Sequence, residues 1–518
     1  MTTETTDPLV RVDAGGRGRD GDFARGPVLL IAAAVAVVLA IASESAGYFF
    51  DELYFLVAGR DHLAWGYFDQ PPLVPALAGL LDRVAPGSLL VFRLPVTLGA
   101  ALTVVLAALI ARELGGGRGA QVLAAGAVAV SGTVLMSHYL ATYTVDPVLW
   151  TLLLWLLARW VRTRSDRLLL LAGVVTAVSL QTKFLVPALW AAVAVGVLVC
   201  GPREMLRRPA LWAGAAVAVV ATVPTLLWQA ANGWPYAQMG AVVRDEWPGA
   251  TEFIIGVVLF AGVVGAPLVL AGLVRVGIAL ARPPHRHPAA WLAVALVGVC
   301  VAFALSGGRS YYTLAILPAL VALGSVELTV WARGRARRTR GTLAALGFTA
   351  GAAALLLSVP VLPEAWLARI PGAPAAAVEA GERVMEPGAM VATTAYQALP
   401  DETRRRTALF AQIYPLAAAV DVLGGRAGGP PAYSPHRGYG YFTPPPESQT
   451  NALWVGFETV PDTFRGYFVD CAPQPADGLQ VWLCTGRTTP WAAMWPSIRT
   501  PITAPRQAAR RCGWACPS

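Results

Sequence analysis

The feature that most constrains this sequence is a series of about eleven apolar runs separated by short polar loops. The runs cover residues 28–42, 89–111, 122–140, 148–161, 168–180, 184–200, 210–228, 253–281, 289–305, 311–331 and 343–361. A helix of about 20 apolar residues crosses the hydrocarbon core of a bilayer, and most of the runs approach that length. In hydrocarbon every backbone polar group has to bond within its own segment, so we expect each run to be an α-helix. The sequence therefore predicts a mainly α, polytopic transmembrane protein.

The composition agrees with a chain that lies mostly in lipid. Hydrophobic residues make up 56% of the chain and charged residues 14%, whereas soluble proteins carry about 25% charged residues. The net charge of +9 is held by basic residues in short clusters between the apolar runs, without the joint basic and aromatic surface that nucleic-acid-binding modules have. We therefore expect the lipid bilayer as a partner and no nucleic acid.

The basic clusters occupy every second loop, and this predicts the orientation of the chain. They precede the first run and follow every second run after it, at Arg11, Arg17, Arg19 and Arg25, at Arg112 and Arg118, at Arg159, Arg162, Arg164 and Arg167, at Arg203, Arg207 and Arg208, at Arg282 and Arg286, and at Arg333, Arg335, Arg337, Arg338 and Arg340. Cytoplasmic loops are enriched in Lys and Arg, so we expect a multi-pass cell-membrane protein with a cytoplasmic N-terminus. A cleaved signal peptide over the first run is the alternative, but the loops alternate correctly when the first run is retained.

The sequence predicts three parts. Residues 1–26 form a cytoplasmic tail, residues 27–361 a transmembrane domain, and residues 362–518 an extracytoplasmic domain. From residue 362 onward the composition is that of a soluble protein. Short β-prone segments at 384–394, 408–413, 451–457 and 479–484 alternate there with turns rich in Pro and Gly. We expect this last part to be a small α/β domain.

Four of the six cysteines lie in this C-terminal part, where an extracytoplasmic compartment permits disulfides. Cys471 and Cys484 flank an apparent hairpin, so we expect them to form a disulfide, with free thiols as the alternative; Cys512 and Cys516 are the other two. The sequence contains no CxxC pair and no cluster of His and Cys with metal-ligand spacing. We therefore expect no bound metal and no cofactor.

Two adjacent acids, Asp51 and Glu52, lie just beyond the first run in a chain that is poor in charge. Ionisable groups at the membrane boundary cost free energy unless they have partners or a function, and a carboxylate within hydrogen-bond reach of a hydroxyl can act as a general base. An ordinary solvated loop, or Asp51 as the N-cap of a helix, is the alternative. Residues 73–81 of the same loop are apolar enough to lie along the membrane interface.

The loop after the first run reads Phe50-Asp51-Glu52-Leu53-Tyr54 and then Trp65-Gly66-Tyr67-Phe68-Asp69-Gln70-Pro71-Pro72-Leu73. An acidic residue in this position, followed by an aromatic-rich stretch that ends in x-Pro-Pro-Leu, resembles the membrane glycosyltransferases called GT-C. The chain is similar in particular to the bacterial relatives of protein O-mannosyltransferases and of the lipid A aminoarabinose transferase, over about residues 28–361. The resemblance implies a sugar donor linked to polyprenyl phosphate and a hydroxyl acceptor, and we expect transfer with inversion at the extracytoplasmic face.

The resemblance implies roles for single residues. Asp51 matches the acid of the family's loop, which implies the catalytic base, and Glu52 matches the acid that often accompanies it. Asp146, in Thr144-Val145-Asp146-Pro147, resembles a second acid at the start of the fourth run, and we expect it to orient the pocket. The residues expected to line the substrate pocket are Tyr54, Tyr67, Asp69 and Gln70. Relatives often have Lys, Glu or His where this chain has Gln70, so we expect a difference in selectivity if this side chain touches a substrate.

The leaving group of such a donor is an anionic lipid phosphate, so the site needs cations near the outer interface. Lys183, in Gln181-Thr182-Lys183, resembles the lysine between the fifth and sixth runs of relatives. Arg309 lies where relatives often have Lys or Arg before aromatic residues, and we expect Tyr311 and Tyr312 to form the phosphate site with it. For each cation the alternative is a side chain that only reaches the lipid headgroups, and the same alternative applies to Arg60, Arg83, Arg93 and Arg244.

The C-terminal part has two segments, Ile413-Tyr414 and Tyr433-Ser434-Pro435-His436, that resemble a stretch of some relatives. Those relatives usually have an Asn-Tyr-Gly-Glu run before it, and this chain lacks that run, so we assign no chemistry to this part. A transporter of lipid-linked or small molecules is the alternative function, and a non-catalytic scaffold is a third. Transporters commonly show internal repeats and broken helices with sites near the midplane, whereas this sequence has no clear repeat and its polar residues lie at the outer ends of the runs.

Overall fold

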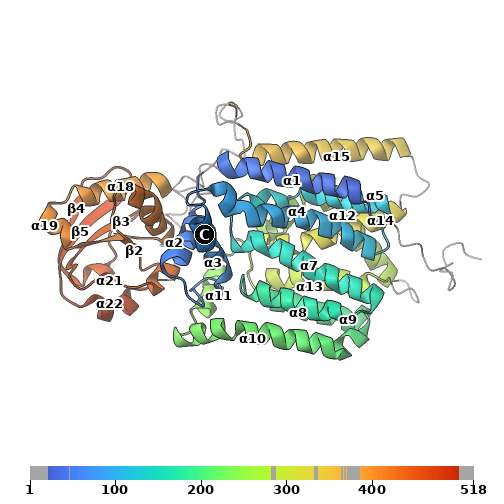
Figure 1. The fold of residues 1–518 in the computed structure, drawn as a ribbon, viewed down its shortest axis with the longest axis horizontal. Coiled ribbons are helices and arrows are strands. Elements are labelled where there is room, and N and C mark those ends of the chain that lie inside the picture. The colour runs from blue at the N-terminus through green and yellow to red at the C-terminus, as the bar shows by residue number, and fades with distance from the viewer. Residues whose placement is uncertain are drawn as a thin grey trace, which may run out of the picture.

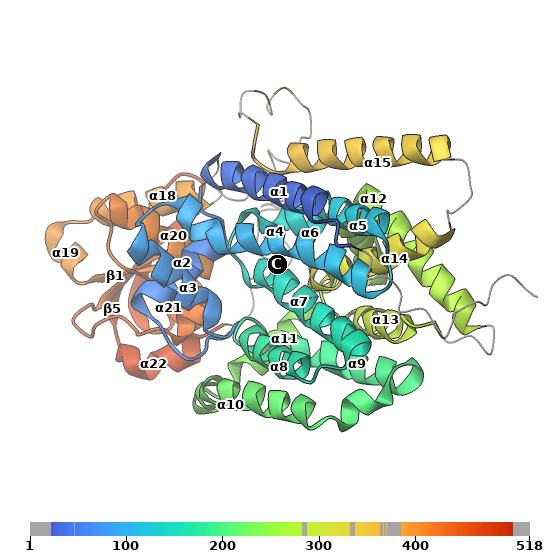
Figure 2. The same cartoon turned by 45° about the vertical axis from the view of Figure 1, so that its right-hand side comes forward.

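The computed structural model describes residues 22–500, except position 46 and the segments 282–286, 332–336, 363–365, 367–368 and 370–384. Most of the described chain is a bundle of long helices, and a smaller part built on a β-sheet lies at one end of it (Figure 1). Two short helices, α2 (Phe50–Asp61) and α3 (Leu73–Val84), lie between the bundle and the sheet. The turned view in Figure 2 shows the same arrangement.

The helices of the bundle coincide with the predicted apolar runs. They are α1 (Arg25–Ser45), α4 (Leu89–Glu113), α5 (Arg118–Ala129), α6 (Gly132–Leu135), α7 (Thr142–Thr163), α8 (Arg167–Leu180), α9 (Val186–Cys200), α10 (Pro209–Ala231), α12 (Ala250–Leu280), α13 (Ala290–Leu305), α14 (Leu317–Trp331) and α15 (Arg337–Ser358). The short helices η1 (Met136–His138), η2 (Arg203–Arg207), α11 (Pro235–Asp245) and η3 (Ser310–Ala315) connect them. The expectation of a mainly helical chain is confirmed.

Five of these helices, α1, α4, α7, α10 and α12, are each long and apolar enough to cross a membrane. Helix α5 and the segment Gly132–His138 are bent by 46° and make a sixth candidate if the pair counts as one span. The apolar parts of the other bundle helices are 10–17 residues long, which is less than the about 20 residues of a perpendicular crossing. The chain is therefore a multi-pass membrane protein, and the number of eleven spans remains a prediction.

The outward faces of the bundle show why it needs lipid around it. In α10 and in α12, only 22% of the most apolar 18-residue stretch is buried inside the protein. Large aliphatic side chains such as Leu227 and Leu259 are 65% and 71% exposed. An apolar face of this size is stable where the surrounding medium is itself apolar, so these helices face the hydrocarbon of a bilayer.

The C-terminal part is an α/β unit with a five-stranded sheet. Its elements are α18 (Met385–Gln397), α19 (Asp401–Arg405), β1 (Thr407–Ala411), α20 (Tyr414–Ala419), η4 (Val420–Gly424), β2 (Ala432–Tyr433), η5 (Arg437–Tyr441), β3 (Asn451–Gly456), α21 (Asp462–Arg465), β4 (Phe468–Gln474), β5 (Gln480–Arg487) and α22 (Trp491–Ile498). The strand order is β2-β1-β3-β5-β4. β1 pairs in parallel with β2 and β3, and β5 pairs antiparallel with β3 and β4.

Three of the four predicted strands are present, as β1, β3 and β5. The strand predicted at 384–394 is wrong, because α18 occupies this segment. The buried residues of α18 are Met385, Ala389, Ala392 and Thr393, a spacing that belongs to one face of a helix. Its alanines also favour the helix over the strand. The sequence indicated β4 only through the apparent hairpin between Cys471 and Cys484; this strand lies at the sheet edge and contains Pro473.

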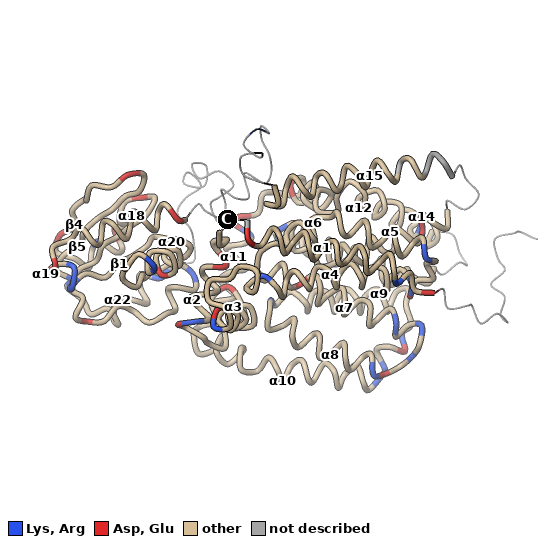
Figure 3. The backbone as a smooth tube through the Cα atoms, turned by 45° about the horizontal axis from the view of Figure 1, so that its top comes forward, with Lys and Arg blue, Asp and Glu red and all other residues tan. Residues whose placement is uncertain are grey.

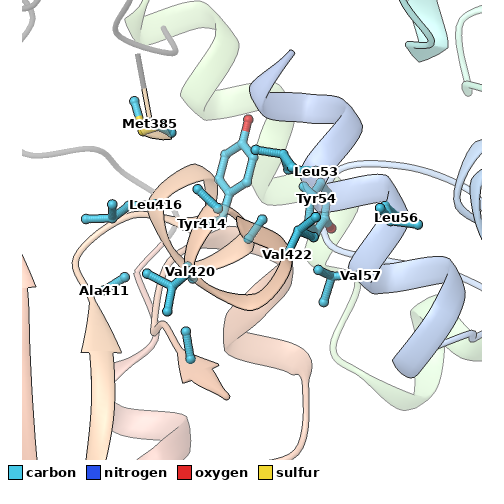
Figure 4. Packing of buried hydrophobic residues seen from close by; sticks show 14 of the residues in the cluster. Leu53, Tyr54, Leu56, Val57, Met385, Ala411, Tyr414, Leu416, Val420 and Val422 are labelled. Atoms are coloured by element: carbon cyan, nitrogen blue, oxygen red, sulfur yellow. The ribbon is translucent and has the colours of Figure 1, made fainter. Parts of the chain in front are cut away.

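Both faces of the sheet are buried at strands β1 and β3, and one of them joins the C-terminal part to α2. In β1, Ala408 and Phe410 point to a core formed with α21 and α22, whereas Leu409 and Ala411 point to the opposite face. That opposite face packs with α18, α20 and η4 and continues into α2. The side chains that meet across this contact include Leu53, Leu56, Val57, Leu416, Val420 and Val422 (Figure 4). The sheet and the helix therefore share one hydrophobic core.

A disulfide joins Cys471 to Cys484 across the paired strands β4 and β5. The two residues are direct partners in the antiparallel register, which brings their Cα atoms to 4.0 Å. Cys200 and Cys300 are half-buried free thiols in the bundle. Cys512 and Cys516 lie outside the described residues.

Helices α2 and α3 approach each other so closely that glycine is needed at their contact. A Cβ atom added at Gly59 would lie 1.8 Å from the carbonyl oxygen of Pro75, and one added at Gly79 would lie 2.4 Å from the carbonyl oxygen of Gly59. Both obstacles are backbone atoms, so no side-chain rotation can relieve them. The segment predicted to lie along the interface, 73–81, is thus helical and is packed onto α2.

Gly59→Ala should lower the thermal unfolding temperature of the purified protein in detergent. Overpacking of this kind typically costs about 1–3 kcal/mol. The matched control is Gly119→Ala in α5, because nothing lies within 4 Å of its added carbon and Ala is the better helix former by about 1 kcal/mol. Equal unfolding temperatures for the two variants would contradict the close packing of α2 against α3.

Candidate active site

A cavity of about 1060 Å³ lies where α2, α11 and η3 meet the C-terminal part. Of the residues expected at the site, the cavity brings together Asp51, Asp69, Gln70, Lys183, Arg309, Tyr311 and Tyr312. Its lining also includes His138, Tyr139, Tyr143, Tyr236, Arg244, Tyr414 and Arg437. Glu52, Tyr54, Tyr67 and Asp146 are not part of this lining.

Asp51 lies in the first turn of α2 and is half-buried. Its Oδ1 accepts a hydrogen bond of 2.7 Å from the hydroxyl of Tyr414. Burial is the largest influence and raises the pKa of Asp51 to about 6, and the negative charge of Asp69 acts in the same direction. The Tyr414 hydrogen bond and the charges of Arg437 and Arg309 lower this pKa. The carboxyl group is therefore ionised at neutral pH and still close to the range in which it takes up a proton, as a general base requires.

Glu52 points away from the cavity into a fully buried ion pair with Arg93, and both side chains are 0% exposed. Its carboxylate accepts bonds of 2.9 and 2.6 Å from Arg93 and further bonds from the backbone N–H groups of Leu140 and Phe49. Arg93 also donates to the carbonyl oxygen of Ser43. This geometry is that of a structural ion pair, and it leaves Glu52 no contact with the cavity. Arg93 does not extend to the headgroups, because its partners hold it inside the protein.

The aromatic loop before α3 contributes two side chains to the cavity, and it is supported by Tyr67 of the loop and Tyr54 of α2. Asp69 and Gln70 line the cavity. The hydroxyl of Tyr54 donates to Asp69 Oδ1 at 3.1 Å, and the hydroxyl of Tyr67 lies 3.2 Å from the carbonyl oxygens of Ala58 and His62. Burial raises the pKa of Asp69, while the charge of Arg437 lowers it.

Gln70 is only 3% exposed, and its Nε2 has no hydrogen-bond partner among the described residues. A buried amide donor without a partner is costly in a folded protein. Because Gln70 lines the cavity, this donor is available to an oxygen atom bound there.

Lys183 lies in the turn between α8 and α9, which is tied to α3 by a 2.9 Å bond from the N–H of Leu73 to the carbonyl oxygen of Gln181. Its Nζ lies 4.2 Å from the ring centroid of Tyr312 and 5.6 Å from that of Tyr311. Such cation–π contacts stabilise an ammonium group that is partly removed from water. The tyrosines thus hold the lysine at the cavity wall.

Asp146 lies behind this wall, near the start of α7, and is 5% exposed. Its Oδ1 has no hydrogen-bond partner among the described residues. The second acid of the sequence prediction is therefore buried behind the cavity wall and does not line the cavity.

Arg309 and Arg437 converge on one carboxylate, that of Glu246, which follows α11. Arg437 donates to Glu246 Oε1 at 3.0 Å, and Arg309 donates to Oε2. Arg309 Nη1 also lies 3.4 Å from the Tyr311 hydroxyl. All three charged side chains are less than one fifth exposed. They connect the bundle, the loop after α11 and the C-terminal part at the cavity.

Sequence reasoning missed Glu246, Tyr414 and Arg437. Glu246 carries a usable signal, since it forms a pair of adjacent acids with Asp245, as Asp51 and Glu52 do, in a chain that is poor in charge. Tyr414 belongs to a segment that resembles a stretch of some relatives, but no chemistry could be assigned to it, and Arg437 carries no signal of its own. The role of both residues depends on where the C-terminal part lies. Among the described residues, no group of three or more His, Cys, Asp or Glu side chains is arranged to hold a metal ion.

The remaining cations of the sequence analysis differ in their surroundings. Arg244 lines the cavity. Arg60 forms a half-exposed ion pair with Asp61, at 2.8 Å, and Arg83 is exposed on α3. Arg244 is therefore the one of these three arginines that lies at the site.

Residues 69–228 match the family model described as dolichyl-phosphate-mannose-protein mannosyltransferase. This stretch begins in the aromatic loop and ends in α10, so it includes Asp69, Gln70, Asp146 and Lys183. No curated protein sequence matches the chain.

Two solved structures match nearly the whole chain. ArnT from Cupriavidus metallidurans bound to undecaprenyl phosphate has a TM-score of 0.57 and 17% identity, over 92% of this chain and 99% of that one. The same protein in the apo state has a TM-score of 0.59 and 16% identity, over 93% of this chain and 100% of that one. The chain thus has the fold of ArnT, and its resemblance to GT-C glycosyltransferases of the ArnT and mannosyltransferase type is confirmed.

Glu52→Gln should destabilise the protein, because Arg93 would keep a buried charge without its counter-ion. Breaking a buried ion pair at one side typically costs about 3–5 kcal/mol, so the unfolding temperature in detergent should fall by several degrees. Asp51→Asn, one residue earlier and half-buried, is the control and should change the unfolding temperature far less. An unfolding temperature of Glu52→Gln equal to that of the parent would reject the structural role.

Proposed function

We propose that this chain is a membrane glycosyltransferase that transfers a sugar from a polyprenyl-phosphate donor to a hydroxyl acceptor at the extracytoplasmic face, with inversion. The observation that carries the proposal is the cavity itself. It unites one carboxylate suited to a general base, Asp51, with the cations Lys183, Arg309 and Arg437. Transfer of a sugar from a lipid phosphate needs a base to accept the proton of the acceptor hydroxyl and cations to stabilise the anionic phosphate that leaves.

The proposed reaction is a single displacement at the anomeric carbon. The oxygen of the acceptor hydroxyl attacks this carbon, its proton passes to Asp51, and the bond between the carbon and the phosphate oxygen breaks. The lipid phosphate leaves with the electron pair of that bond. Because phosphate is a good leaving group, the reaction requires one base and no general acid.

The cations hold the departing phosphate. Lys183 offers its ammonium group from the cavity wall, and Arg309 adds the positive charge of its guanidinium group there. Charge-assisted hydrogen bonds of this kind are roughly twice as strong as neutral ones. Tyr311 and Tyr312 keep both cations in position, and Asp146 orients the pocket from behind its wall.

The sugar lies, in this proposal, between the base and the cations. Asp69 and Gln70 are the polar side chains of the aromatic loop that reach it, and Tyr54 and Tyr67 hold the loop in shape. The ArnT structure bound to undecaprenyl phosphate supports a polyprenyl-phosphate donor, because the fold is the same.

The proposed topology has eleven spans, a cytoplasmic N-terminus and an extracytoplasmic C-terminal part. In chain order the parts are the tail 1–26, the transmembrane catalytic domain 27–361 and the domain 362–518. Figure 3 supports this orientation, since Lys and Arg gather at the end of the bundle remote from the sheet. Cytoplasmic loops carry such an excess, so the cavity at the opposite end opens to the outer face.

The test of the function is sugar transfer by the purified protein from a polyprenyl-phosphate sugar to a hydroxyl acceptor. Asp51→Asn should lower kcat by about 100- to 10,000-fold, the usual contribution of a general base. The control is Asp477→Asn, an exposed acid in the turn between β4 and β5, which should transfer like the parent.

Two results would contradict the proposal. Near-normal turnover by Asp51→Asn would remove the base from the mechanism. Translocation of the lipid-linked sugar without transfer would favour the transporter instead.

Thiol labelling tests the topology, in a background without the four cysteines outside the Cys471–Cys484 bridge. Arg118→Cys, in an exposed position at the start of α5, should react with a membrane-impermeant reagent only after the inner face is opened. Arg405→Cys, exposed on α19, should react in intact cells. The reverse pattern at either position would overturn the orientation.

A further inference from the structure

The C-terminal part reaches the cavity through the ends of two neighbouring parallel strands. Strand β1 ends at Ala411 and is followed by Tyr414, and strand β2 ends at Tyr433 and is followed by Arg437. In open α/β sheets, functional side chains gather at the carboxyl ends of parallel strands. Here these ends point at the cavity, and both Tyr414 and Arg437 line it.

Tyr414 is held rigidly at this position. Its side chain is almost fully buried, its ring lies 5.0 Å from the ring of Tyr54, and it stacks on the ring of His436 at 5.5 Å. The N–H of Tyr414 also donates to Nδ1 of His436 at 3.3 Å. The hydroxyl that bonds to Asp51 at 2.7 Å therefore has little freedom to move away.

The docking of the C-terminal part on α2 fixes Tyr414 relative to Asp51. Besides the shared hydrophobic core, the backbone at Gly438 lies directly against α2, since a Cβ atom there would be 1.8 Å from the hydroxyl of Tyr54. Next to it, Arg437 has a left-handed φ of 48°, which costs a non-glycine residue on the order of 1 kcal/mol. In this conformation its guanidinium binds Glu246.

We infer that the C-terminal part completes the reaction centre, and that Tyr414 is a positioning residue that orients the Asp51 carboxylate toward the acceptor hydroxyl. This inference rests on the proposed function. The hydroxyl of Tyr414 donates a hydrogen bond to Oδ1 of Asp51. The other carboxylate oxygen, Oδ2, is then the one that accepts the proton of the acceptor hydroxyl. It also stabilises the ionised carboxylate, the form in which Asp51 is a base.

The charged and titratable groups around Asp51 come from several elements. Asp69 faces it from the aromatic loop, Tyr143 from α7, Arg309 from the start of η3, and Arg437 from η5. Tyr414 contributes the direct hydrogen bond. A donor to the carboxylate lowers its pKa, so loss of the Tyr414 hydroxyl raises the pKa of Asp51. The base is then protonated over a wider range of pH.

The experiment compares kcat/KM over pH for the parent and for Tyr414→Phe, which keeps the ring and removes the hydroxyl. The acid limb should move upward by about one pH unit, as expected for a lost bond to a charged group. With the Asp51 pKa at about 6 in the parent, the loss of rate is then about fivefold larger at about pH 6 than at about pH 9. A purely structural role would give a loss that does not depend on pH.

The matched control is Tyr467→Phe. Its hydroxyl bonds to Ser497 on the exposed surface of the same C-terminal part, so the pH profile should be that of the parent. Unfolding temperatures of both variants in detergent show whether the fold is retained.

A second variant should move the acid limb in the opposite direction. It tests the inference even if the Tyr414→Phe variant does not fold. A fluorinated tyrosine with a more acidic phenol, introduced at position 414, donates a stronger hydrogen bond and should move the acid limb to lower pH. An acid limb that stays at the parent's position in both variants, with the parent active, overturns the inference and leaves the proposed function standing. A parent that transfers no sugar overturns both.

Discussion

Glu52 and Arg93 form a fully buried ion pair that ties the start of α2 to α4, and Arg93 reaches on to the end of α1. Burying two charges costs free energy unless their hydrogen-bonding groups are satisfied, and here backbone groups take up the remaining positions. Successive residues of a helix project about 100° apart. With Glu52 fixed in the core, Asp51 has to face the cavity. The position of the proposed base thus depends on the acid beside it.

The charged side chains that line the cavity are likewise stabilised by neighbouring groups. Glu246 draws Arg309 and Arg437 together, and the rings of Tyr311 and Tyr312 accompany Lys183. Each cation is therefore held before a substrate arrives. Preorganised charge of this kind stabilises a transition state without a further cost of reorganisation, and in the proposed reaction it stabilises the departing phosphate.

Local rules explain what the sequence predicted and what it did not. A membrane helix satisfies the hydrogen bonds of its own backbone, so composition and run length were enough to predict the bundle. The order of the motifs was enough to predict that Asp51 and Lys183 belong to one site, and both line the same cavity. The error at 384–394 came from β-prone residues within an alanine-rich helix, α18. Tyr414 lies 363 positions from Asp51 in sequence, and their contact depends on the fit of two apolar surfaces, which no local pattern encodes.

The core shared by α2 and the C-terminal part has a consequence during synthesis of the protein. Chains are made from the N-terminus at about 5–20 residues per second. The 363 positions between Asp51 and Tyr414 then correspond to a delay of about 20–70 s. During this interval Leu53, Leu56 and Val57 lack the apolar side chains of the C-terminal part that later cover them. Exposed apolar side chains of this kind are the surfaces that chaperones bind. In the proposed mechanism, a chain whose C-terminal part has not yet been made lacks Tyr414 and Arg437 at the cavity and is therefore inactive.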